Sequence, residues 1–264
     1  MKDKLTQKMK KQKYGLCIGT PFTGEKVNVQ YMESMVKTHR YFQKAGIPLL
    51  NIYLYNCSLI TKGRNDVISQ FYNKTKLDYF LFIDSDMSWN PEDIIKLMNA
   101  DKELVGATYP KKAINWREIQ QCVHHGLADN VGEMLNKTSE YTVWIKDKVE
   151  SKKEELIKVN RLGTGFMMIK RSLIKKLKSK NRNLIYLMDD KKSKGIAIFE
   201  SQVKNGEHLS EDYAFCERVQ DVGTDVLIHP ELKINHHGGN MTFNGNYKKR
   251  LEYEQEIQEI LRNS

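Results

Sequence analysis

The sequence of 264 residues predicts an α/β fold in which a mainly parallel sheet is flanked by helices. Over the first hundred residues, short apolar segments alternate with segments whose apolar residues recur at helical spacing. One apolar run, Tyr79–Ile83, ends in two carboxylates within the stretch DYFLFIDSDMSWNPED. Because ligands bind at the carboxyl edge of such sheets, we expect a functional site there.

Four elements are expected before this run: two strands, each followed by a helix. Gly46 is the expected stop of the first helix, since a left-handed residue commonly follows a helix end. In order, the elements are a strand at 14–19 that is broken by 20–24, a helix at 28–45, a strand at 47–55 and a helix that opens with Gly63-Arg64-Asn65-Asp66.

The run Tyr79–Ile83 is rich in aromatic and β-branched residues, which is typical of a strand buried on both faces. Beyond it, Asn90 can cap a helix whose first position is Pro91. The two carboxylates, Asp84 and Asp86, are therefore expected on a strand-to-helix connection.

Between 111 and 158 the sequence becomes polar with poor periodicity, and we interpret this part as a variable insertion. Regular elements are expected on both sides of it. They are strands at 103–109, 163–169 and 226–228, and helices near 171–177, at 211–222 after a cap at Ser210, and at 247–261.

Basic residues outnumber acidic ones by 43 to 33, and the formal charge of +10 favours polyanionic partners such as nucleotides, nucleic acid or acidic membrane surfaces. Much of the excess lies in patches at the N-terminus, near residue 180 and near residue 250. Such patches are more often solvated faces than binding sites, so the charge does not choose among these partners.

The four cysteines, Cys17, Cys57, Cys122 and Cys216, are widely spaced without a CxxC pair, so neither a zinc site nor a disulfide framework is indicated. No apolar run approaches the length of a membrane span, and the N-terminus lacks the apolar core of a signal peptide. We therefore expect a soluble, intracellular protein of the cytoplasm.

Asp84 and Asp86 have no Lys or Arg beside them in the sequence, so the two carboxylates would repel each other unless a cation neutralised them. A divalent metal is the simplest such cation, although capping or solvated acids would give the same pattern. Hard oxygen ligands suit Mg²⁺ or Mn²⁺, which complete their shell with water and substrate phosphates. The pair therefore predicts a phosphate-bearing substrate.

Two further clusters carry side chains suited to chemistry. In the segment INHHGG, an imidazole from His236 or His237 would favour Mn²⁺ over Mg²⁺, although adjacent histidines also occur in polar turns. In the segment SEDYAFC, Glu211 and Asp212 either complement a helix dipole or supply a general base that takes the proton of an attacking hydroxyl.

Taken in order, the segments TPF, GRND, FLFIDSDM, LGTGFMMI, SEDYAFC and INHHGG resemble the GT-A glycosyltransferases, especially family-2-like and mannan-polymerase-like members. The resemblance covers residues 14–240 except 111–158. It implies a Rossmann-like, mixed sheet in a single domain, with a nucleotide-binding half at 14–110, an acceptor and catalytic half at 159–245, and a C-terminal helix at 246–264.

The resemblance implies that Asp84-Ser85-Asp86 is the DxD motif of this family, with Asp86 the firmer metal ligand. Asp84 would reach the metal or, together with Ser85, the donor. His236 would be the third protein ligand, with His237 as the alternative. The bound metal, Mn²⁺ or Mg²⁺, would neutralise the diphosphate leaving group.

The same resemblance makes Asp212 the general base of inverting chemistry, with Glu211 beside it. The enzyme would be a hexosyltransferase that moves a sugar from a UDP- or GDP-linked donor to the hydroxyl of a glycan, a lipid-linked glycan, a protein or a modified nucleic acid. Donor contacts would come from Thr20, Pro21 and Phe22 at the base, from Arg64 and Asn65 at the ribose or phosphate, and from the backbone of Gly163 and Gly165 at the sugar.

Other functions stay open. A haloacid-dehalogenase-type phosphatase also places DxD after an apolar strand, but normally after the first strand and with Thr or Val next, whereas Met87-Ser88 follow here. A sugar nucleotidyltransferase can use a similar sheet and metal site, but no Gly-rich phosphate signature lies near the N-terminus. The basic patches lack the interleaved aromatics of a nucleic-acid binder, yet a glycosyltransferase acting on hydroxylated DNA bases agrees with the charge.

Overall fold

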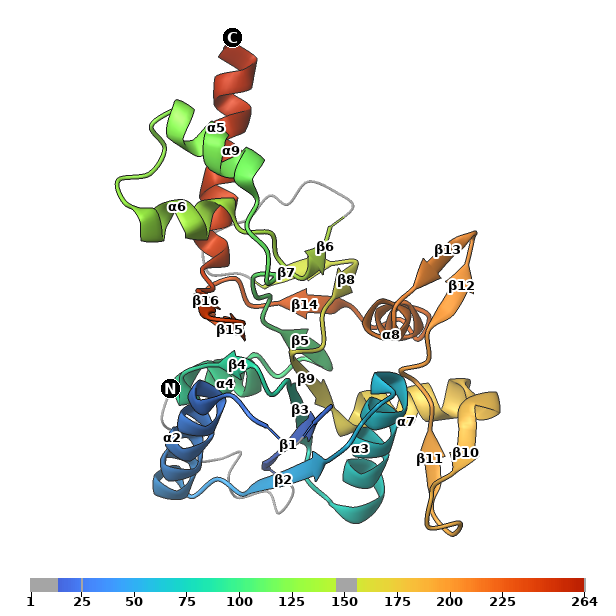
Figure 1. The fold of residues 1–264 in the computed structure, drawn as a ribbon. Coiled ribbons are helices and arrows are strands. Elements are labelled where there is room, and N and C mark those ends of the chain that lie inside the picture. The colour runs from blue at the N-terminus through green and yellow to red at the C-terminus, as the bar shows by residue number, and fades with distance from the viewer. Residues whose placement is uncertain (1–13, 25, 146–155, 264) are drawn as a thin grey trace.

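A computed structural model describes residues 14–24, 26–145 and 156–263 (Figure 1). The basic N-terminal patch and residues 146–155 of the predicted insertion lie outside the described residues. The centre of the molecule is a seven-stranded sheet in the order β2-β1-β3-β9-β5-β14-β7. Helices cover both faces of this sheet, which confirms the predicted α/β fold class.

Five of the seven strands run in the same direction. Pairing is parallel among β2, β1 and β3 and between β5 and β14, whereas β9 lies antiparallel between β3 and β5, and β7 is antiparallel at one edge. The predicted mixed, mainly parallel sheet is thereby confirmed. Its strands are β1 (Leu16–Pro21), β2 (Leu49–Leu54), β3 (Tyr79–Ile83), β5 (Leu104–Gly106), β7 (Ile157–Val159), β9 (Phe166–Lys170) and β14 (Val226–Ile228).

The side chains of the strands alternate between two separate cores. In β3, Phe80 and Phe82 face one core, while Leu81 and Ile83 face the other. Both faces of the strand are therefore dry, as expected for a strand of apolar residues only. The helices against the first face are α3 (Ile60–Lys74), α7 (Arg171–Lys180) and α8 (Glu211–Gln220), and those against the second are α2 (Val29–Ala45) and α4 (Pro91–Ala100).

Several helix ends follow the signals in the sequence. The side chain of Asn28 accepts a hydrogen bond from a first-turn N–H of α2 at 3.0 Å, and this helix ends at Gly46, whose φ is 65°. Asn90 and Asp93 form a capping box at the start of α4, with Pro91 at its first position. These contacts satisfy backbone groups that a helix end otherwise leaves free.

Several boundaries differ from the predicted ones. The strand predicted at 103–109 is only Leu104–Gly106, and the one predicted at 163–169 is Phe166–Lys170. β1 continues through Thr20 to Pro21. Beyond Gly19 it pairs with β2 and no longer with β3, so the missing N–H of Pro21 breaks no hydrogen bond on the β3 side. α3 begins at Ile60, before the predicted start at Gly63. Its N-cap residue, Leu59, makes no side-chain cap, so the sequence carries no signal for this start.

The described part of the predicted insertion is more regular than expected. It contains α5 (Trp116–His124) and α6 (Val131–Thr138), which lie beside the C-terminal helix α9 (Tyr247–Asn263) in the upper part of Figure 1. Both helices have a local start signal, because the side chains of Asn115 and Asn130 accept hydrogen bonds from the N–H groups of Glu118 and Glu133, three residues further on. These capping signals did not enter the prediction, and of the α5 side chains only Cys122 is buried.

Small antiparallel sheets complete the described part of the molecule. One has three strands in the order β16-β15-β4, and another joins β6 to β8. The elements are β4 (Met87–Ser88), β6 (Val143–Trp144), β8 (Arg161–Leu162), β15 (Asn235–Gly238), β16 (Met241–Phe243), the hairpin strands β10 (Ile185–Leu187) with β11 (Lys194–Ile196) and β12 (Gln202–Lys204) with β13 (Glu207–Leu209), and the 3₁₀ helix η1 (Arg182–Leu184).

All four cysteines are buried and free. Burial raises the pKa of the Cys17 and Cys216 thiols to about 12, so both are protonated and unreactive near neutral pH. Among the helices in the described part of the chain, none is both long and apolar enough to cross a membrane.

Replacing Phe80 by alanine should lower the free energy of unfolding by about 3–5 kcal/mol, because it leaves a cavity among closely packed rings. Phe80 is fully buried, and its ring centroid lies 5.1 Å from that of Phe71 and 4.6 Å from that of Phe82. Urea unfolding followed by circular dichroism measures the change. The control Val203→Ala, at a position that is 72% exposed, should shift stability by less than about 0.5 kcal/mol. Equal midpoints for the two variants would contradict the described core.

Candidate functional site

The predicted motifs meet at one edge of the sheet. β1, β2, β3 and β5 end there, and the antiparallel β9 begins there, with Ile83 opposite Phe166. Asp84 directly follows β3, and its backbone N–H donates to the carbonyl of Gly165 at 3.1 Å. Segments that are distant in sequence are thus joined at the edge where α/β folds bind ligands.

The Asp84 carboxylate is held by Arg64 of α3. Its two oxygens each accept a hydrogen bond from the guanidinium at 3.1 Å, and Arg64 Nε lies 3.4 Å from Glu211 Oε1. The guanidinium also lies 5.3 Å from the ring centroid of Phe82. Burial alone would lower the pKa of Arg64, but the two carboxylates outweigh this effect and raise it. Arg64 is therefore a permanent buried cation.

The expectation that Asp84 and Asp86 lack a basic neighbour is wrong in three dimensions. α3 packs against β3 and brings Arg64 to the strand end, and Lys112 forms an ion pair with Asp86. Both carboxylates thus have a side-chain cation, although neither cation lies near them in the sequence. Mutual repulsion of unneutralised acids is consequently no argument for a metal here.

Asp86 has a different environment from Asp84. Its Oδ2 contacts Lys112 and lies 3.5 Å from Nε2 of His236. Burial alone would raise the pKa of Asp86, but the hydrogen bonds with His236 and Lys112 outweigh it and lower the pKa from 3.8 to about 2. Its Oδ1 is buried and has no hydrogen-bond partner in the described part of the chain. A buried carboxylate oxygen without a partner is a natural place for a ligand.

His236 points its Nε2 at Asp86. Its Nδ1 lies 2.8 Å from the carbonyl oxygen of Pro110, and since that oxygen can only accept, Nδ1 carries a proton. Nε2 faces the carboxylate, to which it donates when it carries a proton, and it offers a lone pair to a cation when it does not. The β15–β4 pairing fixes this position by placing His236 opposite Met87, and the ring packs edge-on against Tyr109.

His237 has a structural environment instead. Its Nδ1 lies 3.0 Å from the hydroxyl of Thr242 and its Nε2 lies 2.8 Å from the hydroxyl of Ser88, so both ring nitrogens are already engaged. The side chain is buried, and this burial lowers its pKa. Of the two histidines that the sequence left open, His236 has the geometry of a ligand.

The predicted set of three metal ligands is not assembled as such. Among the described residues, no group of three His, Cys, Asp or Glu side chains is arranged to hold a metal ion. Asp84 is turned to Arg64, whereas Asp86 Oδ1 and His236 Nε2 are available. One carboxylate and one imidazole fit a divalent cation of the Mg²⁺ or Mn²⁺ type, which takes much of its shell from water and substrate phosphates.

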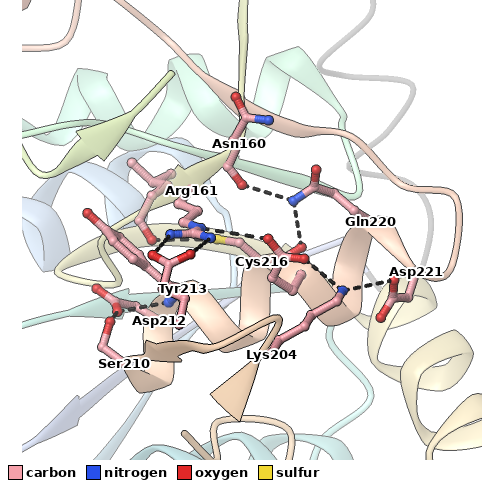
Figure 2. A network of polar contacts seen from close by, with 12 residues as sticks. Asn160, Arg161, Lys204, Ser210, Asp212, Tyr213, Cys216, Gln220 and Asp221 are labelled. Carbon is pink, nitrogen blue, oxygen red and sulfur yellow. Dashed lines mark hydrogen bonds and ion pairs between the residues drawn. The ribbon is translucent and has the colours of Figure 1, made fainter. Parts of the chain in front are cut away.

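Asp212 lies in the first turn of α8. Its Oδ1 accepts hydrogen bonds from the hydroxyl of Ser210 and from the N–H of Tyr213, the latter at 2.8 Å (Figure 2). Ser210 therefore binds Asp212 and makes no side-chain cap to the helix backbone, contrary to expectation. The second oxygen of Asp212 makes no hydrogen bond with the described residues and is free to accept one.

A polar network fixes α8 to the rest of the fold (Figure 2). Arg161 of β8 donates to both oxygens of Glu207, at 2.6 and 2.8 Å, and lies 3.6 Å from Glu217 of α8. Lys204 binds Glu217 at 2.8 Å, and Gln220 donates to the carbonyl of Asn160 at 2.9 Å. Asp212 is thus carried by a helix that is tied to several elements and is not on a loose loop.

Gly163 and Gly165 give room to side chains of the same chain. A Cβ at Gly165 would lie 2.5 Å from the hydroxyl oxygen of Tyr109, and one at Gly163 would lie 2.8 Å from it. The Tyr109 hydroxyl accepts a hydrogen bond from the N–H of Gly165 at 2.9 Å. These glycines are explained by packing around Tyr109, so the predicted contact with a donor sugar rests on the resemblance alone.

The segment after β1 contributes an aromatic cluster. The ring of Phe22 stacks on that of Tyr55, with centroids 5.5 Å apart and an interplanar angle of 11°, and also packs against Tyr53. Tyr55 is 64% exposed. Thr20 is fully buried and shares a hydrogen bond of 2.7 Å with Tyr31. Phe22 is 7% exposed and supports Tyr55 from below, so Tyr55 is the ring of this cluster that a planar ligand can reach.

Asn65 faces the interior of the protein. It is 1% exposed, its amide donates to Glu200 at 2.8 Å, and its oxygen accepts from the N–H of Phe199 at 2.8 Å. It thereby ties α3 to the segment before β12. In this conformation Arg64 lies at the sheet edge and Asn65 does not.

Sequence reasoning missed three residues of the site. Lys112 and Tyr109 lie at the border of the segment that was set aside as variable, and Tyr55 ends the second predicted strand. Only Tyr55 left a signal, an exposed aromatic residue directly beyond a strand. Lys112 and Tyr109 are brought to Asp86 and His236 by the fold, through contacts that no local pattern predicts.

The proteins found to be similar to this chain share its backbone fold and little of its sequence. No protein-family profile matches the sequence, and no curated protein matches it significantly. A197 from STIV is 15% identical, with a TM-score of 0.46 over 88% of this chain and 94% of its own. Residues 1–349 of S. aureus TarS in complex with UDP are 14% identical, with a TM-score of 0.39 over 81% and 57%.

A third structure, a glycosyltransferase involved in the glycosylation of the major capsid of PBCV-1, is 16% identical. Its TM-score is 0.25, over 37% of this chain and 52% of its own. At such scores and identities the likeness concerns the fold alone, and the activity of this chain has to be argued from its own residues.

The phosphatase alternative needs Asp84 as a nucleophile. Both oxygens of Asp84 are held by a guanidinium that is 4% exposed, and the residue follows the third strand of the chain. A carboxylate in a two-pronged, charge-assisted contact is a poor nucleophile because attack would break both hydrogen bonds. The geometry disfavours this alternative.

Replacing Lys112 by methionine should raise the pKa of Asp86 from about 2 towards 3.8, because an ion pair that favours the ionised form is lost while burial remains. The stability that ionised Asp86 contributes is fully present above pH 3.8 and is lost as the pH falls towards 2. The variant should therefore be less stable than the wild type above pH 3.8, and this difference should shrink as the pH falls towards 2. Carboxyl ¹³C chemical shifts report the titration. The neighbouring Lys111→Met, which removes the contact with Glu140, should leave Asp86 unchanged. A pKa that is equal in both variants would show that Lys112 is not the partner of Asp86.

Proposed function

We propose that this protein is a metal-dependent glycosyltransferase that moves a sugar from a nucleotide-diphosphate donor to a hydroxyl acceptor. One observation carries the proposal: Asp86 has a buried oxygen without a partner among the described residues, and His236, held through its Nδ1, directs its Nε2 at the same carboxylate. This pair lies at the edge of an α/β sheet where phosphate-bearing ligands bind. It offers a cation two ligands and leaves its remaining positions to phosphate oxygens and water.

When bound at Asp86 and His236, a divalent cation would supply electrostatic stabilisation of the nucleoside diphosphate that leaves. Of the two cationic side chains at the site, Lys112 can also stabilise the leaving diphosphate. Lys112 has a side chain that is 36% exposed and sits beside Asp86, so its ammonium can turn to a phosphate once Asp86 has another partner. Arg64 is fully committed to Asp84 and Glu211, which suits it to holding the strand end in place.

For the donor base we propose Tyr55, because a planar ring can stack on this exposed side chain, which Phe22 holds in place from the other side. The strand order β2-β1-β3 places the strand ends that carry Tyr55, Phe22 and Asp84 side by side. The proposal does not decide between a UDP- and a GDP-linked donor, since stacking is tolerant of the base.

We propose Asp212 as the general base. One of its oxygens is fixed by Ser210 and Tyr213 while the other can accept the proton of the acceptor hydroxyl. Glu211 is occupied by Arg64, which leaves Asp212 as the freer of the two adjacent acids. A single base that activates the acceptor corresponds to inverting transfer.

Asp86→Asn should abolish metal-dependent donor binding, because the amide removes the charge that holds the cation. Calorimetric titration of UDP, GDP and their sugar conjugates, with Mn²⁺ and then with EDTA, measures it. The control Asp189→Asn, at a side chain that is 85% exposed, should bind like the wild type. If the wild type binds none of these nucleotides with Mn²⁺, the proposed function is wrong. Equal binding by both variants would remove Asp86 as a ligand.

Asp212→Asn should leave donor affinity within about twofold while turnover falls by roughly 10²–10⁴, the usual contribution of a general base. Transfer to the hydroxyl acceptor, or slow hydrolysis of the donor when none is known, provides the rate. Asp221→Asn lies just beyond the same helix, on a side chain that is 58% exposed, and should keep wild-type turnover. Undiminished turnover in Asp212→Asn would assign the base elsewhere.

A further inference from the structure

A second concave surface lies beside the candidate site, between β6 and α9. It is a cleft of about 360 Å³, which is within the range of sites for small organic ligands. Its floor contains two tyrosines, Tyr141 and Tyr247, whose rings pack at 5.1 Å. Trp144 stands on its rim.

This cleft, the β6–α9 cleft, is separated from the site at Asp86 by one strip of chain, residues 110–112. Lys111 lines the cleft, whereas the next residue, Lys112, contacts Asp86, and the preceding carbonyl of Pro110 accepts the hydrogen bond from His236. The backbone N–H of Lys111 donates to the carbonyl of Glu140 at 2.7 Å, so this strip is held against the cleft wall. The cleft and the candidate site thus share the same short segment.

The charges of the cleft cancel. Lys111 lies 3.1 Å from Glu140, and Arg250 lies 2.8 Å from Glu254, so its two cations are each paired with a carboxylate and the lining has no net charge. The whole chain, in contrast, carries +10. A cleft built to hold a polyanion would leave its cations unpaired, as phosphate-binding surfaces do. Paired carboxylates and cations instead offer donors and acceptors to neutral hydroxyl groups.

Trp144 has the setting of a rigid stacking platform. Its side chain is 42% exposed, and the guanidinium of Arg161 lies 4.7 Å from its ring centroid. The β6–β8 pairing places Trp144 opposite Arg161, and Arg161 is itself fixed by Glu207. The indole is thus held in place before any ligand arrives, which lowers the entropy lost on binding. Apolar faces of sugar rings pack well on such a surface.

We infer that the β6–α9 cleft binds the acceptor, and that this acceptor is a neutral saccharide stacked on Trp144. The inference rests on the proposed function for its catalytic meaning, because it assigns the acceptor of that site. It selects the glycan from the acceptors that the sequence left open and disfavours a DNA base, whose phosphate backbone would find the cations Lys111 and Arg250 already paired with carboxylates.

The test is a calorimetric titration of the metal-free, nucleotide-free protein with cellobiose, mannobiose and N,N′-diacetylchitobiose. We expect saturable binding of at least one disaccharide, weakened about tenfold or more in Trp144→Ala. Trp144→Phe keeps an aromatic face and should recover most of the affinity. The matched control Trp116→Ala, at a tryptophan of α5 that is 71% exposed and outside the cleft, should bind like the wild type.

Three outcomes would overturn the inference: no binding of any disaccharide, equal binding by Trp144→Ala and Trp116→Ala, or displacement of the bound disaccharide by duplex DNA. Donor titration with Mn²⁺ on the same variants separates this failure from that of the proposed function. Donor binding that is intact while disaccharides do not bind would reject the cleft alone. Disaccharide binding that depends on Trp144 without any nucleotide binding would keep the cleft and reject the transferase.

Discussion

The contact between Arg64 and Asp84 is the interaction on which the site depends. A guanidinium that is 4% exposed would be strongly destabilising without a partner, and here it is paired with Asp84 at the end of β3 and with Glu211 at the start of α8. Three elements from different parts of the chain are thereby fixed around one buried charge. The same contact also determines which acid remains available for a ligand.

The two acids of the DSD segment have different roles because their surroundings differ. Asp84 is saturated by two hydrogen bonds, whereas Asp86 keeps a buried oxygen without a partner and has its pKa lowered by Lys112 and His236. Adjacent titratable groups in contrasting environments are a recurring feature of catalytic sites. The histidine that contacts the other oxygen of this carboxylate is oriented by a main-chain carbonyl, which is how many metal-binding imidazoles are held.

The positive charge of the chain and its candidate site are separate features. The site contains Arg64 and Lys112, but each is paired with a carboxylate, and the adjacent β6–α9 cleft has no net charge. The excess of basic residues is therefore carried by other surfaces, such as the lysine-rich outer side of α7. Net charge describes the solubility and long-range field of this protein better than it describes the ligand.

The sequence alone determined the α/β order, the buried strand before the two acids, and the helix ends at Gly46 and Asn90, because these follow from periodicity, apolar runs and capping, which are local. Tertiary structure decided which cations face the acids, which of His236 and His237 faces Asp86, and that Gly165 makes room for Tyr109. These features depend on contacts between residues far apart in sequence, and no local pattern encodes such contacts.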